Sequence, residues 1–164
     1  MTAEEAFERY HQSVFAFVYR MTRRVDIAED VTQESFMVLV RAPDKFDSSR
    51  ATLKTYLLAI ARNLALARLR ANRREPQLPA GHPDPEVRSS SATSTLVENA
   101  VSKLPHLQRE ALILFEYEGL TLHEIATVIE TDTGTVKSRL HRARANLKRI
   151  LAPVAIKGSS NESR

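Results

Sequence analysis

The stretch from Thr133 to Ile150, TGTVKSRLHRARANLKRI, organises the interpretation of the whole chain. Its apolar residues recur at the spacing of one helical face, and they are Val136, Leu140, Ala143 and Leu147. Its cations lie on the remaining surface with no acidic residue among them, and they are Lys137, Arg139, Arg142, Arg144, Lys148 and Arg149. This pattern predicts an amphipathic helix with one buried apolar face and a basic outer surface.

A second helix is predicted directly upstream of this stretch. Thr121-Leu122-His123-Glu124 has the form Ser/Thr-x-x-Glu, in which the threonine hydroxyl and the glutamate each accept a hydrogen bond from an otherwise unpaired backbone N–H. A short helix from about Leu122 to Ile129, a tight connection from Glu130 to Asp132 and the basic helix together make a helix-turn-helix. Asp132 is the expected N-cap of the basic helix.

The outer face of the basic helix suits a DNA major groove. Small and hydrogen-bonding residues lie near its start and cations along its length, in the order Gly134, Ser138, His141, Arg142, Ala145 and Arg149, flanked by Lys137 and Lys148. The alternative is a solvated basic face on a surface helix. The capping box and turn immediately upstream favour the DNA-binding interpretation.

Bulk properties bound the class of protein. The chain has 164 residues and a net charge of +4, and its cations concentrate in two clusters, Arg62 to Arg74 and Lys137 to Arg149. Two basic clusters suggest a polyanion contacted at two points. The absence of cysteine excludes disulfides and thiolate chemistry. No apolar run is long enough to span a bilayer and the N-terminus is too polar for a signal peptide, so a cytoplasmic location is expected.

The fold class predicted is all-α, with two small helical domains joined by a flexible linker. Glycine is scarce and strand-like alternation is absent. Residues 1–74 form the first domain, with helices expected over Ala3 to Thr22, from Asp26 to about Arg41, and over Leu53 to Arg74. The linker spans residues 75–94, where four prolines precede a serine-rich run.

The second domain is expected over residues 95–151. Helices predicted from Leu96 to Leu104 and from Leu107 to Tyr117 precede the helix-turn-helix, and Gly119 is a suitable residue to end the latter. Residues 152–164 contain Pro153 and a polar C-terminus, so they are expected to fray into a flexible tail.

The helix predicted from Asp26 to Arg41 is apolar on two sides. One stripe contains Ile27, Val31, Ser35 and Val38, and the other contains Phe36, Met37 and Val40 beside Glu29 and Gln33. A small bundle needs only one of these faces for its own core. The second face is therefore either a docking surface for a large partner or a surface covered within the bundle, and periodicity alone does not decide between them.

The helix predicted from Leu53 carries a line of three chemically different side chains. Tyr56, Asn63 and Arg70 follow one another at spacings of i, i+7 and i+14. An aromatic ring, an amide and a guanidinium could stack on a base, bind a base edge and hold a phosphate of an unpaired strand. Each side chain also has an ordinary role at a protein surface, so both interpretations stay open at this point.

Catalytic motifs are not evident. The histidines are scattered, with no HExxH pair, and there is no glycine-rich phosphate loop. Glu29, Asp30 and Glu34 crowd one helix and could in principle bind a divalent ion, although favourable charge near a helix N-terminus explains them as well. No enzyme activity, cofactor, metal or small-molecule substrate is therefore expected.

Taken together, the motifs of both halves resemble one family, the extracytoplasmic-function (ECF) group of sigma-70 family sigma factors. The matching words of the first half are AEDVTQESF at residues 28–36, Phe46, TYL at 55–57 and IARN at 60–63. Those of the second half are LP at 104–105, RE at 109–110, EGLT at 118–121, EIA at 124–126, GTVKSRL at 134–140 and RAR at 142–144. They cover most of residues 5–150 outside the linker.

The resemblance implies a sigma subunit that binds core RNA polymerase and directs promoter recognition. The first domain would be similar to sigma region 2, in which the polymerase-binding residues are Asp30, Gln33, Glu34 and Phe36. Its contacts with the minus-10 element would come from Phe46, Lys54, Tyr56, Arg62, Asn63 and Arg70. The second domain would be similar to region 4, in which the minus-35 element is read by Thr135, Lys137, Ser138, Arg139, His141, Arg142 and Arg144. Members of this group are commonly inhibited by an anti-sigma factor, so such a partner is expected to clamp between the two domains.

Four positions depart from the family pattern, and one of them is Thr131, which stands at a usual isoleucine position. Tyr56 stands where a tryptophan is usual, which keeps a stacking ring of smaller area. Ala67 replaces a usual aspartate. Glu130 stands where a turn glycine is common, and a non-glycine residue forced to positive φ costs on the order of 1 kcal/mol. A strained or differently shaped turn is therefore expected at Glu130.

Two other functions remain as alternatives at this stage. The first is a free-standing helix-turn-helix regulator that binds duplex DNA without polymerase, which leaves the extra apolar face of the first domain unexplained. The second is a metal-dependent enzyme that uses Glu29, Asp30 and Glu34 as ligands.

Overall fold

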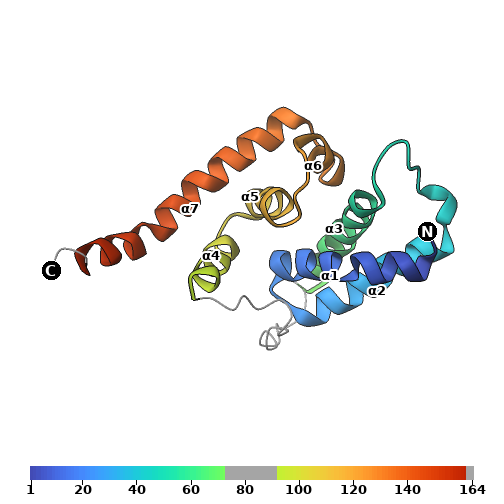
Figure 1. The fold of residues 1–164 in the computed structure, drawn as a ribbon, viewed down its shortest axis with the longest axis horizontal. Helices are drawn as coiled ribbons and strands as arrows, with labels where there is room; N and C mark the ends of the chain where they lie inside the picture. Colours follow the sequence, from blue (N-terminus) through green and yellow to red (C-terminus); the bar gives the residue numbers. More distant parts are fainter. Residues whose placement is uncertain (73–91, 162–164) are drawn as a thin grey trace.

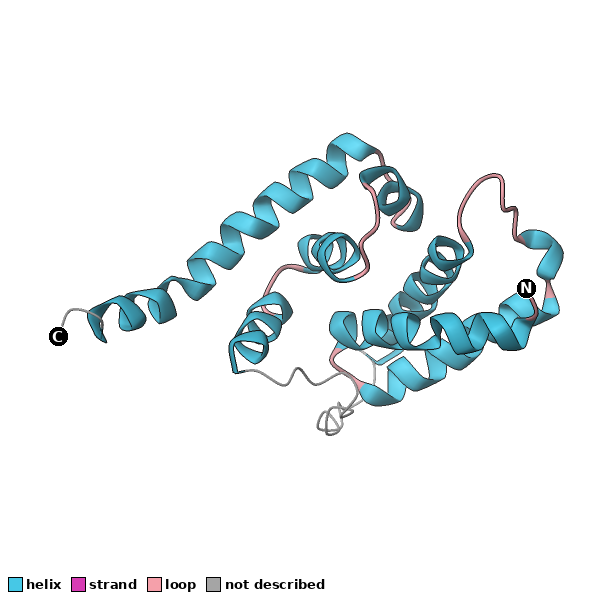
Figure 2. Ribbon diagram, viewed as in Figure 1, coloured by secondary structure: helices cyan, strands magenta, loops and turns pink. Residues whose placement is uncertain are grey.

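The structure is a computed structural model that describes residues 1–72 and 92–161. All regular elements within these ranges are helices, as Figure 2 shows, which confirms the predicted all-α class. The linker predicted for residues 75–94 lies outside the described residues up to residue 91. From Ala92 onward the chain is helical, so the second half begins within the segment predicted to be linker.

The N-terminal half is built from three helices, α1 (Ala3–Thr22), α2 (Val25–Arg41) and α3 (Leu53–Asn72), which match the predicted ranges within a few residues. Thr2 closes a capping box with Glu5 at the start of α1. A short 3-10 turn, η1 (Pro43–Lys45), follows α2 because Pro43 cannot extend the α-helix. Helices α1 and α2 lie side by side, and α3 packs against both around Phe17 and Leu57 (Figure 1).

The C-terminal half contains four α-helices and one π turn. They are α4 (Ala92–Ser102), α5 (His106–Leu112), the π turn η2 (Ile113–Tyr117), α6 (Leu122–Val128) and α7 (Thr133–Asn161). The predicted capping box forms at Thr121 and Glu124, where the hydroxyl and the carboxylate accept each other's backbone N–H. Helices α6 and α7 are the predicted helix-turn-helix, and α7 also packs on α5 (Figure 1).

Helix α7 is longer than the sequence suggested. It continues to Asn161, whereas residues 152–164 were expected to form a frayed tail. Once a helix is formed, each added residue gains one backbone hydrogen bond for one residue fixed, so a single proline need not end it. Figure 1 shows the distal part of α7 running away from the body of the molecule towards the C-terminus.

Two turns in the C-terminal half use the left-handed region of backbone space. Gly119 has a φ of 68° and Glu130 a φ of 55°. Glycine adopts such values freely, whereas an L side chain crowds the following carbonyl. The strained turn predicted at Glu130 is therefore confirmed. The backbone N–H of Thr131 closes this turn with a 2.9 Å hydrogen bond to the carbonyl of Ala126.

The two halves pack against each other. Helix α3 contacts α6, and α1 contacts α4, α5 and the π turn. Buried residues of both halves belong to one continuous apolar core, which includes Leu57 and Ala61 of α3 and Ile113 and Ile125 of the C-terminal half. Local sequence patterns do not predict this closed arrangement, in which α5 and α6 face the helix predicted to open the promoter.

Substitutions at Gly119 and Glu130 should change the free energy of unfolding in opposite directions. Gly119→Ala should lower the free energy of unfolding by about 1 kcal/mol through backbone strain alone, because no atom lies within 4 Å of an added Cβ. Glu130→Gly should raise it by roughly 0.5 kcal/mol, since relief of strain outweighs the greater entropy of unfolded glycine. Urea unfolding measures both, and a loss of stability in Glu130→Gly would contradict the strained-turn interpretation.

Candidate nucleic-acid interface

The start of α7 is fixed by Asp132, as predicted. The backbone N–H of Thr135 donates to Asp132 Oδ1 at 2.7 Å, and the Thr135 hydroxyl donates to Oδ2 at 3.0 Å. These hydrogen bonds, led by that of the Thr135 amide, hold the pKa of Asp132 below its usual value. The cap removes unpaired donors and sets the position from which the first turn of α7 projects.

The basic face of α7 is open to solvent. Val136, Leu140 and Ala143 are buried against the rest of the C-terminal half, which confirms the predicted apolar face. On the opposite side, Lys137, Ser138, His141, Arg142 and Arg144 are exposed, while Thr135 and Arg139 are half-buried. All the residues predicted to read the minus-35 element therefore belong to one helix, and most of them are exposed.

Arg144 is a member of this set that contacts residues outside α7. Its guanidinium lies 5.2 Å from the centre of the Phe115 ring and 3.5 Å from a carboxylate oxygen of Glu116. Both Arg144 and Glu116 are about half exposed, so solvent screens this ion pair and it contributes little to stability. The contacts orient Arg144 beside the face that carries His141 and Arg142.

A second set of predicted DNA-binding residues lies on α3 and the loop before it. The rings of Phe46 and Tyr56 pack at a tilt with their centres 5.2 Å apart, and both are half-buried. Asn63 and Arg70, farther along α3, are exposed. The structure thus brings Phe46 and Tyr56 together as one aromatic cluster. Asn63 and Arg70 remain exposed, and Asn63 Oδ1 accepts a hydrogen bond from Arg62 at 3.4 Å.

The two remaining members of this set, Lys54 and Arg62, are engaged by the C-terminal half. Lys54 Nζ lies 3.3 Å from a Glu118 carboxylate oxygen and donates to the Glu118 carbonyl at 2.9 Å. Arg62 donates through Nε and Nη2 to both carboxylate oxygens of Glu110, at 3.0 and 3.2 Å. Cations expected to face DNA are therefore neutralised by carboxylates of the same chain.

Glu110 is the most deeply buried charge in the described part of the chain, with a fully buried side chain. Burial alone raises the pKa of a carboxyl group, but the neighbouring His106 and Arg62 outweigh it and hold the pKa of Glu110 below its usual value. His106 Nε2 stands 3.5 Å away, at ion-pair distance rather than in a well-formed hydrogen bond. The carboxylate thus stays ionised because Arg62 pairs with it.

The pKa of Glu118 is shifted in the opposite direction from that of Glu110. Burial raises its pKa above the usual value, and the nearby Lys54 offsets this only in part. A raised pKa means that protonation favours the folded arrangement, whereas the lowered pKa of Glu110 means that protonation opposes it. The two carboxylates therefore do not combine into a single acid-sensitive switch.

The π turn between these two acids places both on the side that faces α3. Residues eight positions apart, such as Glu110 and Glu118, point about 80° apart around a regular α-helix. The turn at Ile113–Tyr117 widens the helix, shown by the hydrogen bond from the Glu118 N–H to the Ile113 carbonyl at 3.1 Å. One extra residue in the turn rotates Glu118 back towards Glu110. Sequence reasoning missed both acids, although a glutamate adjoining the apolar run Ala111 to Leu114 was a usable signal.

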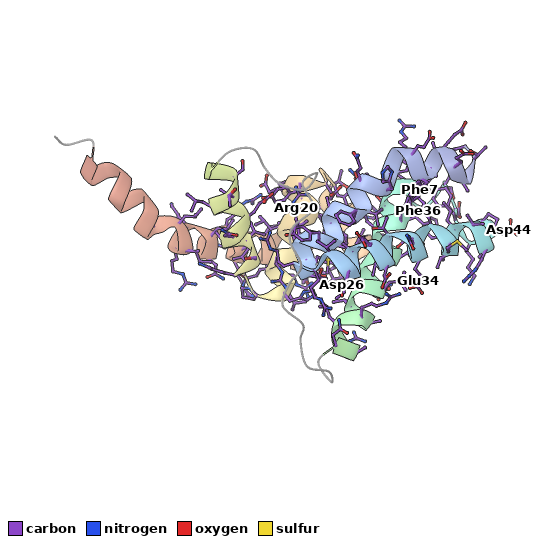
Figure 3. All side chains as sticks on the ribbon, turned by 90° about the horizontal axis from the view of Figure 1, so that it is seen from below. Phe7, Arg20, Asp26, Glu34, Phe36 and Asp44 are labelled. Atoms are coloured by element: carbon purple, nitrogen blue, oxygen red, sulfur yellow. The ribbon has the colours of Figure 1, made fainter. Side chains whose placement is uncertain are left out.

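The polymerase-binding residues predicted on α2 divide into exposed and buried members. Asp30 and Gln33 are exposed, and Glu34 is half-buried. Arg68 of α3 donates to Asp30 at 3.2 Å and also to Glu34. Phe36 is only 6% exposed and packs edge to face on Phe7, with ring centres 5.0 Å apart, as Figure 3 shows. Phe36 is therefore buried inside the N-terminal bundle, and its predicted contact with polymerase stays a prediction.

The second apolar face of α2 is covered within the bundle in one part and exposed in another. Phe36 is covered within the bundle, whereas Met37 and Val40 remain 43% and 52% exposed. Beside Gln33 they form a small uncovered apolar area on α2. The area suits contact with another protein, because isolated domains rarely leave neighbouring large apolar side chains in water.

The described residues do not provide the geometry that the alternative of a metal-dependent enzyme requires. Among the described residues, no three His, Cys, Asp or Glu side chains cluster in a way that could hold a metal ion. Asp30 and Glu34 instead bind the guanidinium of Arg68, so a cationic side chain occupies the space between them. Within the same described ranges, no helix has the length and apolar character required to cross a membrane.

The fold and these surfaces define a two-part helical protein that carries a helix-turn-helix and a second cationic and aromatic helix suited to nucleic acid. Two family models match the chain in this order, sigma-70 region 2 over residues 6–75 and sigma-70 region 4 over residues 94–147. The chain belongs to the ECF RNA polymerase sigma factors of the sigma-70 family.

Curated relatives from distant bacteria support this assignment. The chain is 30% identical to the RNA polymerase sigma-H factor of Pseudomonas aeruginosa, covering 89% of this chain and 84% of the relative. It is also 30% identical to the ECF sigma factor SigW of Bacillus subtilis, with 87% and 84% covered. Against SigE of Mycolicibacterium smegmatis the identity is 30% and the coverage 91%, but the chain spans only 61% of that protein.

Solved structures show the same fold. The sigma factor RpoE of Bartonella quintana, solved with the anti-sigma factor NepR, superposes with a TM-score of 0.77 at 27% identity over 91% of this chain and 96% of the other. CnrH, solved with the cytosolic domain of CnrY, superposes with a TM-score of 0.67 over 92% and 88% at 22% identity, a similarity that concerns the fold alone.

Replacing Glu110 by glutamine should destabilise the protein in a pH-dependent way. Near neutral pH the loss should be roughly 3 kcal/mol, because Arg62 is left with no charged partner in a buried site. The pKa of folded Glu110 lies below the unfolded value of 4.5, so its contribution is complete above pH 4.5 and disappears as the pH falls through the lower folded value. Denaturant unfolding at several pH values measures this.

The control is Glu116→Gln, which removes a half-exposed acid close to the same π turn. It should change the free energy of unfolding by less than about 1 kcal/mol at any pH. A Glu110→Gln effect as small as that of the control, or one that stays constant down to acidic pH, would contradict the proposed pairing.

Proposed function

We propose that this sigma factor divides promoter recognition between the two surfaces described above, with α7 on the minus-35 element and α3 with its preceding loop on the minus-10 element. As a sigma factor it binds core RNA polymerase and directs transcription initiation. The observation that carries the division is the order of the two family matches along the chain, each of which coincides with one cationic surface. The role is one of recognition, with no catalytic step assigned to the chain.

Reading of the minus-35 element is proposed for the first turns of α7. Lys137, Ser138, His141 and Arg142 project from one exposed face beside a capped N-terminus. Hydroxyl and imidazole groups donate to or accept from base edges, arginine binds guanine through two hydrogen bonds, and lysine neutralises phosphate. The half-buried Thr135 and Arg139 at the edge of this face suit phosphate contacts that fix the register of the helix.

Opening of the minus-10 element is proposed for the aromatic cluster of Phe46 and Tyr56 and for Asn63 beyond it. Extrusion of one base costs a few kcal/mol, and stacking on an aromatic ring with contacts to phosphates can offset this amount. Lys54, Arg62 and Arg70 would supply the phosphate contacts. Strand opening would then use binding energy alone, without ATP.

Core polymerase is proposed to dock on α2. Asp30 and Gln33 offer charge and hydrogen bonds, and the exposed Met37 and Val40 add an apolar contact on the same helix. This surface also argues against the alternative of a free-standing helix-turn-helix regulator. Such a regulator needs neither an uncovered apolar area on α2 nor a second DNA-binding helix.

An anti-sigma factor is proposed as a further partner. The RpoE structure that superposes over 91% of this chain was solved with the anti-sigma factor NepR. A superposition across both halves supports a shared closed arrangement, which an inhibitor could stabilise by binding the two halves together. Cells in which promoter activity is constitutive under all growth conditions would contradict this proposal.

Transcription in vitro with core polymerase over genomic fragments tests the proposed function most fully. The purified chain should associate with core polymerase and initiate at a limited set of start sites that share two upstream elements. Absence of binding to core polymerase in a pull-down experiment would overturn the proposal. Tight binding to duplex operators without polymerase would support the free-standing regulator instead.

Replacing Arg142 by alanine should weaken promoter use through the minus-35 element. Loss of a base contact costs about 1–3 kcal/mol, so transcription at limiting sigma factor should fall roughly tenfold or more. Binding to core polymerase should not change, because Arg142 is exposed on α7 and distant in sequence from α2. Lys103→Ala, which removes an exposed cation outside α7, is the control. Loss of polymerase binding together with transcription would contradict the assignment.

Replacing Tyr56 should separate stacking from other functions of α3. Tyr56→Ala should reduce strand opening by roughly tenfold, since a stacked base contributes about 1–3 kcal/mol. Tyr56→Phe keeps the ring against Phe46 and should retain most of the activity. Permanganate reactivity of unpaired thymines in the minus-10 element measures opening directly. Equal opening by the alanine variant and the wild-type chain would remove Tyr56 from the proposed site.

A further inference from the structure

Three cations lie along one flank of α7. Lys137, Arg144 and Lys148 follow one another at spacings of seven and four residues, so their side chains project within about 40° of one another around the helix. From Lys137 to Lys148 the helix rises by roughly 16 Å. Lys137 and Lys148 are exposed, and the Arg144 side chain is about half exposed. The flank borders the face that carries Ser138 and Arg142, on the side where the phosphates at the edge of a groove would lie.

Arg144 packs on an aromatic ring from another element. Its guanidinium carbon lies over the ring of Phe115 in the π turn η2, 5.2 Å from the ring centre. Phe115 is half-buried and packs against the apolar core, so the position of its ring is fixed. Asn146 of α7 donates to Gln108 of α5 at 2.6 Å, which fixes the register of the two helices beside this contact. The ring therefore determines where the guanidinium lies.

The π turn divides its side chains between the core and α7. Ile113 and Leu114 are fully buried, whereas the next two residues, Phe115 and Glu116, both contact Arg144. Single-turn π segments have poorer hydrogen-bond geometry than an α-helix and occur frequently at functional sites. The contact with Arg144 gives this π turn a place beside the proposed DNA-binding helix.

A guanidinium that rests on a ring keeps its donors available. Its five N–H bonds lie in the plane of the group and point outward from its edge, whereas stacking on a ring uses the face of the plane. Glu116 meets Arg144 Nη2 at 3.5 Å, and because both side chains are about half exposed, solvent screens this ion pair. A phosphate oxygen can therefore replace Glu116 while Phe115 stays in contact with Arg144.

We propose that Phe115 is a positioning residue for duplex DNA, which holds Arg144 in line with Lys137 and Lys148 so that the three cations bind phosphates of one strand beside the minus-35 element. The proposal rests on the proposed function for the identity of α7 as the minus-35 helix. Arg144 contacts the phosphate, and Phe115 acts through Arg144. Because the arginine is already ordered, binding loses less side-chain entropy than it would with a free arginine.

The phosphate contact is tested with the full chain and with DNA of no particular sequence. A labelled mixed-sequence duplex of about 20 base pairs is a suitable probe, because phosphate contacts are independent of sequence. Fluorescence anisotropy over a range of salt concentrations gives the affinity and its slope against the logarithm of salt concentration. Arg144→Ala should weaken binding and reduce the magnitude of the slope by about 1, the value for one lost phosphate contact. An unchanged slope would overturn the contact.

The positioning role is tested by variants of Phe115. Phe115→Leu should weaken duplex binding roughly threefold with no change in slope, because Arg144 keeps its charge but must now be ordered on binding. Phe115→Tyr keeps the ring and should bind as the wild-type chain does. In the Arg144→Ala background, Phe115→Leu should have no further effect. Phe15→Leu is the matched control, since Phe15 is also half-buried and stacks on Tyr19 in the N-terminal half.

A loss of affinity in Phe115→Leu that persists in the Arg144→Ala background would overturn the positioning role, because the effect would then not pass through Arg144. If circular dichroism shows that Phe115→Leu has lost its helices, Arg144→Lys replaces it. Lysine keeps the charge but lacks the planar group that stacks on a ring, so it should bind roughly threefold more weakly with the slope unchanged. Equal affinity of Arg144→Lys and the wild-type chain would overturn the proposal.

These results are separable from those of transcription with core polymerase. Active transcription together with an unchanged slope in Arg144→Ala would overturn this inference alone and leave the proposed function intact. The expected slopes and affinities without transcription would support the roles of Arg144 and Phe115 and leave the proposed division of the promoter unsupported. Absence of salt-dependent duplex binding by the wild-type chain would overturn the phosphate contact.

Discussion

The ion pair between Arg62 and Glu110 is the interaction on which the arrangement of the molecule depends. A carboxylate with no exposed surface stays ionised only beside a cation, and Arg62 supplies that cation through two hydrogen bonds from the other half of the chain. The pair fixes the face of α5 that lies against α3. The π turn then brings Glu118 to Lys54, and Glu124 follows from α6 to Thr55.

This constraint explains why two surfaces of similar charge differ in availability. The basic face of α7 lies opposite its buried residues Val136, Leu140 and Ala143, so packing of the C-terminal half leaves it in solvent. Lys54 and Arg62 of α3 lie beside the residues that pack on the C-terminal half, so packing of the two halves pairs them with carboxylates. The basic face of α7 is thus exposed to solvent, whereas the cations Lys54 and Arg62 of α3 are paired with carboxylates.

Local sequence signals predicted most of the individual elements. Capping boxes at Thr2 and Thr121, the N-cap at Asp132 and the strained turn at Glu130 all involve hydrogen bonds or dihedral angles within a few residues. The pairing of residues 62 and 110 could not be predicted in this way, because nothing within either segment specifies the other. The π turn likewise follows from packing and has no distinctive residue.

The same distinction applies to the candidate site. The exposed face of α7 followed from helical periodicity, since one face of an amphipathic helix must be solvated when the other is buried. The burial of Phe36 could not be predicted, because periodicity shows that a second apolar face exists but not that Phe7 of another helix covers part of it. The residues that bind promoter and polymerase remain proposals founded on family resemblance and exposure.

A double-mutant cycle between Arg62 and Glu110 tests most directly whether this ion pair holds the two halves together. The free energies of unfolding of the wild-type chain, Arg62→Gln, Glu110→Gln and the double variant give the coupling between the two side chains without reference to transcription. We expect the double variant to be more stable than the sum of the single losses implies, with a coupling of at least about 1 kcal/mol. Additive losses would show that the two halves are not held together by this pair, and would contradict the closed arrangement described above.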